Sequence, residues 1–440
     1  MKFYNRAKEL SELQRIRDLS FNDHSRLTVV TGRRRIGKTS LIMKSVEDLP
    51  TVYLFAGRKN EATLCSEFIP VIAQSLDVFV PAEINTFRSL FQYLMELATN
   101  KVFNLVIDEF QEFYNINEAV YSDMQHVWDT YRKKTKMNLV VSGSVYSLMQ
   151  KIFQDKKEPL FGRADNIIKL SAFDLVTLKE IMRDHHPKYS NDDLLALYTF
   201  TGGVPKYVEL FCDNDTLTVH EMIAFMVREN APFTDEGKHL LIEEFGKNYA
   251  TYFSVLSAVS GGINTQPEIE ARLGNKSVGG QIKRLIEDYG ILVRQRPVLA
   301  KESSQTVRYE IRDNFIRFWF NYFDRYRSMI EIKNFAGLRS IVQADYPAYS
   351  GVMLERYFKQ QFAESFEYKA IGSWWEQKGN QNEIDIVALK LEKKQAVVVE
   401  VKRQKKNFKP ELLAEKTRHL KDKLLFDYQI ETKCLSLDDM

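Results

Sequence analysis

One segment of eight residues constrains the fold of this chain more than any other. It reads Gly32-Arg33-Arg34-Arg35-Ile36-Gly37-Lys38-Thr39 and fits the pattern GxxxxGK[ST] at every fixed position. An apolar run at 27–31 precedes it, and Ser40-Leu41-Ile42 opens a helix-like stretch after it. Glycines let the backbone wrap a phosphate, and a helix N-terminus adds amide donors and the positive end of a dipole. The segment therefore predicts a strand, a phosphate-binding loop and a helix.

The residues of this loop have distinct expected roles. Lys38 would reach the β- and γ-phosphates of ATP, and Thr39 would hold Mg²⁺. The remaining expected contacts to the nucleotide come from Gly32, Arg33, Arg34, Arg35, Ile36, Gly37 and Ser40. Both ATP and Mg²⁺ are therefore expected ligands.

A second motif follows an apolar run at 104–107, which ends in Asp108 and Glu109. Asp108 would bind Mg²⁺ through water, and Glu109 would orient the attacking water. The alternative is an ordinary acidic turn at the end of a strand.

Two further residues are candidates for sensing the nucleotide. Ser142 ends a fourth apolar run at 138–141, where its side chain would contact the γ-phosphate; the alternative is an ordinary strand-end serine. Arg163, in the turn at 159–163, would reach a phosphate as an arginine finger, unless it is simply solvated. A finger that acts on a neighbouring chain requires a homo-oligomer, whereas one that acts within its own chain does not, and both arrangements stay open.

Apolar runs that alternate with amphipathic stretches predict an α/β fold with a parallel sheet covered on both faces. The expected domains are a P-loop core at 1–170, a helical lid at 171–244, a winged helix with an aromatic connecting helix at 245–330, and a small α/β domain at 331–440. In the last domain, strand-like runs lie at 371–377, 383–389 and 396–401, after a helix at 352–366 and before a basic helical tail.

The C-terminal region carries a second set of charged residues. Asp385 is followed, after an intervening turn, by Glu400 and Lys402, which alternate to the same face of a strand. If the two strands pair as a hairpin, Asp385 joins them. Two carboxylates and a lysine can then hold Mg²⁺ or Mn²⁺ and activate water to cleave a phosphodiester. The alternative is a solvent-facing Glu–Lys pair.

The whole chain resembles the archaeal-type prokaryotic P-loop ATPases, a branch of the AAA+ and STAND assembly. The matching segments are 3–6, 9–10, 32–39, 108–111, 142–144, 159–163, 202–205 and 309–320. The resemblance implies an ATPase core, a helical lid, a winged helix and a C-terminal PD-(D/E)XK nuclease-like domain. It also implies the finger role of Arg163, a switch near Pro205, and Glu355 as the helical acid of the nuclease pattern. Ile384 stands where that pattern normally has proline.

The distribution of charge and of cysteines limits which partners and which cellular compartment we expect. The net charge is only +3, but basic residues concentrate at 401–425 and in the winged-helix segment, and such local excess is typical of phosphate contacts. DNA is therefore an expected partner. The three cysteines lie far apart, which argues against a zinc site or disulfides and fits the cytoplasm. We expect no signal peptide and no membrane association, because no apolar run approaches the length of a membrane span.

These patterns together predict a cytoplasmic, Mg²⁺-dependent ATPase that binds DNA and cleaves it through the C-terminal site. The competing hypothesis is a nucleotide-gated interaction protein, whose winged helix holds a protein and whose nuclease-like face cleaves nothing.

Overall fold

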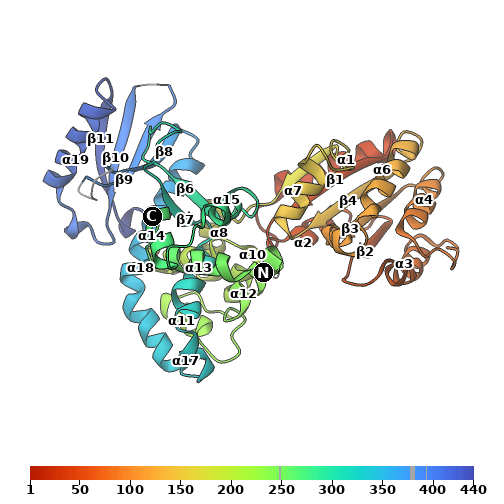
Figure 1. The fold of residues 1–440 in the computed structure, drawn as a ribbon, viewed down its shortest axis with the longest axis horizontal. Coiled ribbons are helices and arrows are strands. Elements are labelled where there is room, and N and C mark those ends of the chain that lie inside the picture. The colour runs from red at the N-terminus through yellow and green to blue at the C-terminus, as the bar shows by residue number, and fades with distance from the viewer. Residues whose placement is uncertain (247–248, 377–381, 393) are drawn as a thin grey trace. The chain divides into compact units, whose positions relative to one another are not determined.

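The fold is described from a computed structural model, which covers the chain except for residues 247–248, 377–381 and 393. Residues 2–172 form one compact unit and residues 173–440 another, and each is described by itself. Figure 1 shows the order of the elements along the chain. The finer division into four domains stays a prediction. Gln377, the last residue of the strand-like run expected at 371–377, lies outside the described residues.

The first unit is built around a five-stranded parallel sheet in the order β2-β3-β4-β1-β5. The strands are β1 (Arg26–Thr31), β2 (Thr51–Phe55), β3 (Phe103–Asp108), β4 (Met137–Gly143) and β5 (Asn166–Lys169). The α/β class and the four predicted strands are confirmed, and β5 is an addition. Because the strands are parallel, their carboxyl ends meet at one edge, where ligands bind in open α/β sheets. The phosphate loop and Asp108 both lie at that edge.

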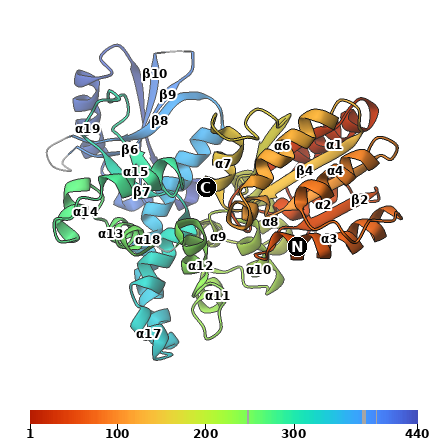
Figure 2. The same ribbon diagram turned by 45° about the vertical axis from the view of Figure 1, so that its right-hand side comes forward.

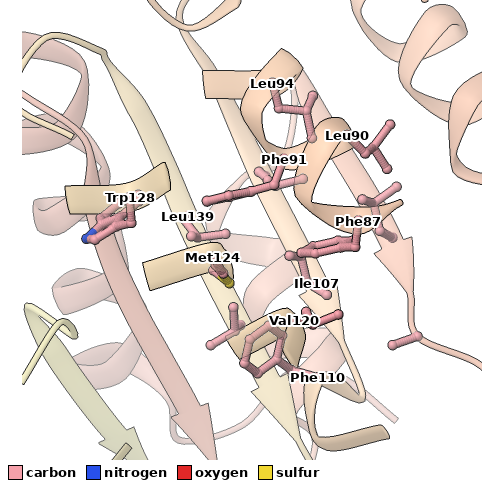
Figure 3. Packing of buried hydrophobic residues seen from close by; sticks show 14 of the residues in the cluster. Phe87, Leu90, Phe91, Leu94, Ile107, Phe110, Val120, Met124, Trp128 and Leu139 are labelled. Atoms are coloured by element: carbon pink, nitrogen blue, oxygen red, sulfur yellow. The ribbon is translucent and has the colours of Figure 1, made fainter. Parts of the chain in front are cut away.

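Helices cover both faces of this sheet. On one face α1 (Ala7–Asn22) and α2 (Lys38–Ser45) pack against β1 and β4. The other face is covered by α3 (Glu61–Leu76), α4 (Phe87–Leu97), α6 (Ala119–Tyr131) and α7 (Tyr146–Gln154), and the short α5 (Phe113–Ile116) lies before α6. Figure 3 shows Phe91 of α4 beside Leu139 of the sheet, and Trp128 of α6 in the same layer of buried side chains. All three side chains are buried, so this core fixes the edge that carries the motifs.

The second unit begins with five helices, in agreement with the helical character expected for 171–244. They are α8 (Leu175–His185), α9 (Asn191–Thr201), α10 (Pro205–Asp213), α11 (Val219–Met226) and α12 (Glu236–Phe245). The predicted turn at 202–205 separates α9 from α10, where both Gly202 and Gly203 have positive φ angles.

The next elements follow in the order predicted for a winged helix: α13 (Tyr249–Ser260), α14 (Gln266–Arg272), α15 (Gly279–Glu287), β6 (Leu292–Gln295) and β7 (Arg308–Ile311). The predicted capping box is present, with Thr265 Oγ donating to Glu268 Oε2 at 2.6 Å. The strands β6 and β7 pair as an antiparallel hairpin. The aromatic segment is buried as expected, and it forms α16 (Asn314–Phe318) and a π-helical turn at 319–324, followed by α17 (Arg327–Glu331).

The C-terminal part corrects two expectations. The helix expected at 352–366 is the end of the 30-residue α18 (Phe335–Glu364), which reaches the sheet of β8, β9 and β10 (Figure 2). The basic helix α19 (Pro410–Lys423) is followed by an unpredicted strand, β11 (Gln429–Leu435). The sheet order is β11-β10-β9-β8, with β8 (Tyr368–Trp374), β9 (Ile384–Lys390) and β10 (Gln395–Val401). In the described part of the chain, each helix is too short or too polar to span a lipid bilayer.

Candidate functional site

The phosphate loop has the backbone expected of it. Gly37 has a φ of +88°, a left-handed conformation that glycine adopts without strain, and α2 begins at the next residue. The Lys38 side chain is only 7% exposed, and its Nζ donates to the carbonyl oxygens of Gly32 at 2.9 Å and Arg33 at 3.2 Å. The lysine therefore folds back over the loop, at the place where a phosphate chain would run.

Arg6, a buried residue ahead of α1, holds the phosphate loop through hydrogen bonds. The Arg6 guanidinium donates to the Ile36 carbonyl at 3.4 Å and to the Ser171 carbonyl at 2.6 Å. The same side chain pairs with Glu9 at 3.4 Å. It ties the loop to the residues that follow β5. The sequence placed Arg6 in an opening motif but assigned it no role.

Asp108 is the most densely hydrogen-bonded carboxylate at the edge. Its Oδ2 accepts from Thr39 Oγ1 at 2.7 Å and from the Tyr53 hydroxyl at 2.8 Å. Its Oδ1 accepts from Ser142 Oγ at 2.5 Å and from the Glu109 N–H at 2.9 Å. The structure thus brings together three residues that the motifs singled out from three different strand ends.

These hydrogen-bond donors keep the Asp108 carboxyl ionised. Burial alone would raise the pKa of this carboxyl, but the donors Ser142, Thr39 and Tyr53 hold it below its ordinary value. Asp108 therefore remains an ionised oxygen donor beside the Thr39 hydroxyl. Mg²⁺ prefers hard oxygen ligands and is held in nucleotide sites by one or two carboxylates together with phosphates and water. The donor set fits Mg²⁺, with Thr39 and Asp108 as the residues that would hold it.

Glu109 has a strained backbone and its own partners. Its φ is +53°, in the left-handed region. Its Oε2 accepts from Gln111 Nε2 at 2.6 Å and from Ser144 Oγ at 2.7 Å. Gly143 makes this packing possible, because a Cβ there would lie 2.3 Å from Gln111 Oε1 and 2.4 Å from Met149 Sδ. The carboxylate expected to orient water is thus held by two side chains.

Three of these residues were not predicted from sequence as site residues: Tyr53, Gln111 and Ser144. Tyr53 is a polar side chain inside the apolar run of β2, which is a weak signal without the strand order. Gln111 and Ser144 were part of quoted motifs, yet Ser142 was preferred to Ser144. The structure gives both serines a partner, since Ser142 binds Asp108 and Ser144 binds Glu109.

Arg163 lies near the amino ends of the strands of this sheet, opposite the carboxyl ends that carry the phosphate loop. The N–H of Asp165 donates to the carbonyl of Leu27, at the start of β1, whereas the phosphate loop follows the end of that strand. The Arg163 guanidinium binds Asp129 Oδ2 at 3.1 Å and the Phe161 carbonyl at 2.9 Å. At about 3.3 Å per residue, β1 puts roughly 20 Å between the two edges. A finger acting on the phosphate loop of its own chain would have to span this distance, so the finger role of Arg163 stays a proposal that favours a second copy of the chain.

The C-terminal acids and lysine also come together. Strands β9 and β10 are antiparallel, and Val399 pairs with Ile386, so that the register brings Asp385 opposite Glu400. Asp385 Oδ2 accepts from the Val401 N–H at 2.7 Å. Glu400 pairs with Lys402 at 2.8 Å and with Lys416 of α19 at 3.2 Å. Lys416 was not predicted, because it comes from a helix whose position depends on β11.

The electrostatics of this cluster are opposite to those around Asp108. Burial and the charge of Glu400 both raise the pKa of Asp385. The hydrogen bond from the Val401 N–H lowers it, but by less than the other two effects raise it. Burial and the charge of Asp385 raise the pKa of Glu355, on α18, to about 7. Burial alone would lower the pKa of Lys402, but Glu400 raises it. Carboxyl groups that lie this close together favour the binding of a cation, because it offsets their mutual repulsion.

The fit of a metal to this cluster rests on two carboxylates. Within the residues that the structure describes, no group of three or more His, Cys, Asp or Glu side chains is arranged to hold a metal ion. Mg²⁺ needs only one or two carboxylates, because it keeps several of its waters. Asp385 and Glu400 supply that number, and they are the residues that would hold Mg²⁺ or Mn²⁺.

Comparisons with known proteins identify families and chains that are similar to this one. Residues 3–211 match a family described as an ATPase domain predominantly from Archaea. Residues 319–417 match a family of archaeal and bacterial proteins of unknown function. The uncharacterized protein MJECL04 of Methanocaldococcus jannaschii is 30% identical over 418 residues, which cover 91% of this chain and 87% of that protein.

A solved structure is similar to this chain at the level of the fold. The Walker-type ATPase PABY2304 of Pyrococcus abyssi is 17% identical, with a TM-score of 0.52, over 72% of this chain and 96% of that one. The ORC2 protein of Aeropyrum pernix, solved in ADPNP–ADP complexes, is 14% identical, with a TM-score of 0.48, over 74% of this chain and 96% of that one.

Proposed function

This chain belongs to the family that joins an archaeal-type P-loop ATPase domain to a C-terminal domain of unknown function, and we propose that it uses ATP to act on DNA. The ATPase domain is a property of the family. We propose two further activities that ATP hydrolysis supports: binding of DNA by the second unit, and cleavage of DNA at Asp385, Glu400 and Lys402. The observation that carries it is the placement of these three side chains from two strands at one point.

The contacts of the ATPase site define what its residues have to do. Lys38 has to exchange the carbonyls of Gly32 and Arg33 for the phosphates of ATP. Mg²⁺, held by Thr39 and Asp108, supplies charge neutralisation at the phosphates. Both bonds to Gln111 and Ser144 end on Oε2 of Glu109, so Oε1 is the oxygen that would accept a bond from the attacking water.

In the C-terminal cluster, each side chain has a distinct task. Asp385 and Glu400 would hold a divalent cation, which supplies an activated water when bound. Lys402 lies beside Glu400 and carries a positive charge, which stabilises the extra negative charge on a phosphodiester under attack. Glu355 adds a third carboxyl from α18, where the charge of Asp385 helps to raise its pKa.

Exposed basic residues around this cluster support DNA as the partner. Arg418, Lys421 and Lys423 are exposed on α19. Cationic side chains that neutralise phosphates release counterions, so the affinity for DNA falls steeply as salt rises. Binding of a labelled duplex to the full chain between 50 and 200 mM salt tests this point. At six or more phosphate contacts, a loss of about 10³-fold is expected over this range.

The second candidate function is a nucleotide-gated interaction protein that does not cleave. One observation favours it: Glu400 is already bound by two lysines, Lys402 and Lys416, which compete with a cation for its oxygens. Binding to a protein partner through an apolar interface would change little over the same salt range. A flat salt response, together with intact ATP hydrolysis, would select this candidate and overturn the first.

A further inference from the structure

The carboxyl ends of β10 and β11 are tied to the first turn of α9. These two strands are parallel neighbours in the C-terminal sheet. Arg403, two residues beyond β10, donates to Asp192 of α9 at 2.8 Å. Leu437, two residues beyond β11, accepts at its carbonyl from Asn191 Nδ2 of the same helix at 2.7 Å. We call these two bonds the α9 clamp, because one helix end holds the ends of two neighbouring strands.

The Arg403 guanidinium is the central group of the clamp. Besides Asp192 it binds the Ser350 hydroxyl of α18, and it lies 5.4 Å from the centre of the Tyr346 ring. The Tyr346 hydroxyl in turn donates to Asp192 Oδ1 at 3.0 Å. The Arg403 side chain is 20% exposed and that of Asp192 32%. Ion pairs in full contact with water contribute little, but a half-buried guanidinium with several partners has one fixed position.

The first turn of α9 leaves Asp192 available for this contact. Ser190 and Asp193 form the capping box of the helix. Asp193 also accepts from the Val219 N–H at 2.8 Å, so its carboxylate serves the cap and α11. Asp192 takes no part in the cap, and its oxygens bind Arg403 and Tyr346 instead. The two neighbouring aspartates therefore have separate tasks.

The backbone just before Arg403 holds the C-terminal cluster together. The Val401 N–H donates to Asp385 Oδ2 at 2.7 Å and so places that carboxylate. The Lys402 N–H donates to the Leu435 carbonyl of β11 at 2.9 Å. Because these two residues directly precede Arg403, a side chain that fixes Arg403 also fixes both N–H groups. The clamp thus acts on Asp385 through the backbone and touches no reacting group.

The clamp also joins the two family segments of the chain. Helix α9 lies within residues 3–211, which match the ATPase family, and Arg403 lies within residues 319–417, which match the family of unknown function. We propose that the α9 clamp positions the C-terminal cluster, so that cation binding by Asp385 and Glu400 depends on a helix of the ATPase segment. Arg403 is the positioning residue. This inference rests on the proposed function, since it names what controls the same site.

Amide hydrogen exchange of the full chain tests the clamp without a metal. Arg403→Gln and Asp192→Asn each remove one side of the ion pair. Both variants should speed exchange at the Val401 and Lys402 amides by about tenfold or more, as expected when a hydrogen bond to a charged group is lost and the strand end opens.

The matched control is Arg327→Gln. It breaks a second Arg–Asp pair, in which Arg327 of α17 binds Asp235 at 2.7 Å outside the clamp. Because both of these side chains are more exposed than those of the clamp, the control should change exchange at the end of β10 by less than about twofold.

Binding of Mn²⁺ alone, followed by electron paramagnetic resonance without nucleotide, tests the effect on the cluster. The part of the binding that Asp385→Ala removes belongs to the cluster. A charge effect alone gives opposite signs, since Arg403→Gln removes a positive charge and Asp192→Asn a negative one. Positioning gives one sign: both variants should weaken Mn²⁺ binding by about tenfold, as for other outer residues of metal sites. Arg403→Lys keeps the charge but not the fork that reaches both Asp192 and Ser350, so its affinity should lie between those of Arg403→Gln and the native chain.

The outcomes separate the clamp from the wider proposal. Opposite signs of Arg403→Gln and Asp192→Asn in Mn²⁺ binding, or exchange in these variants no faster than in Arg327→Gln, would overturn the clamp while leaving the cleavage site intact. If the native chain and Asp385→Ala bind Mn²⁺ alike, the proposed cleavage fails, and control of cation binding by the clamp fails with it. Hydrogen exchange still decides in that case whether α9 holds the strand ends.

Discussion

Asp108 is a buried carboxylate and Asp385 a half-buried one, both beside strand ends, yet their surroundings have opposite effects. Asp108 accepts from three hydroxyls and one N–H, which favour its ionised form. Asp385 accepts from one N–H and lies near Glu400, whose charge disfavours the ionised form of Asp385, while Asp385 in turn raises the pKa of Glu355. The first centre is therefore complete before a cation arrives. The second keeps a charge conflict that a cation, or a proton, has to resolve.

Glu109→Gln gives the largest effect expected at the first centre. The amide keeps the shape of the side chain but no longer serves as a base for water, which is worth about 10²–10⁴-fold in rate. ATP turnover should fall by that amount while ATP binding persists, as measured by phosphate release and nucleotide titration. Glu118→Gln, at an exposed position before α6, is the matched control. Turnover that stays within twofold of the native chain would remove Glu109 from the reaction.

The comparison of the two centres is tested by the same substitution in each. Asp108→Asn loses charge-assisted hydrogen bonds and should destabilise the fold by about 1–3 kcal/mol. Asp385→Asn removes a charge from among like charges and should be neutral or stabilising, by up to about 1 kcal/mol. Unfolding in urea measures both differences. Equal destabilisation by the two variants would mean that the two carboxylates are held alike.

Gly143→Ala sharpens the account of how Glu109 is held. The added methyl group would meet Gln111 and Met149 at impossible distances, and overpacking of this kind costs about 1–3 kcal/mol. We expect a lower melting temperature and slower ATP turnover. In Gly57→Ala the nearest atom would be 3.8 Å away, so the change there should be small. Similar melting temperatures for the two variants would contradict the packing described around Gly143.

Tyr53→Phe should give the smallest effect. It removes one of the four donors to Asp108, and a single hydrogen bond contributes about 0.5–1.5 kcal/mol. The expected result is a modest loss of stability and a modest rise in the Mg²⁺ concentration needed for ATP binding. Nucleotide titration at several Mg²⁺ concentrations measures this. A loss as large as that of Asp108→Asn would mean that Tyr53 has a role beyond one donor.

The sequence predicted those parts of the fold that depend on local patterns. The phosphate loop, Asp108 and the four strands follow from short motifs and apolar runs. Tyr53 depends instead on the pairing of β2 with β3, which brings Phe55 beside Asp108. Strand β11 was missed because its side chains are mostly exposed and polar, as befits the edge of a sheet. The early start of α18 was missed because Pro347 lies inside it.

The same distinction applies to the sites. Asp385, Glu400 and Lys402 are close in sequence, and one hairpin pairs them. Lys416 and the first turn of α9 reach this region through long-range packing, which no local pattern encodes. Arg163 was expected near the phosphates from its position after β4, but the parallel strand β5 that follows it has to start at the far edge of the sheet.

Cleavage of DNA by the native chain, compared with Asp385→Ala and Lys38→Ala, decides between the two candidate functions. Plasmid and single-stranded DNA are incubated with Mg²⁺ or Mn²⁺, with and without ATP. We expect cleavage by the native chain, its loss in Asp385→Ala with ATP hydrolysis intact, and loss of ATP hydrolysis in Lys38→Ala. Cleavage that persists in Asp385→Ala, or its absence under every condition while ATP is hydrolysed, would contradict the account and favour the nucleotide-gated interaction protein.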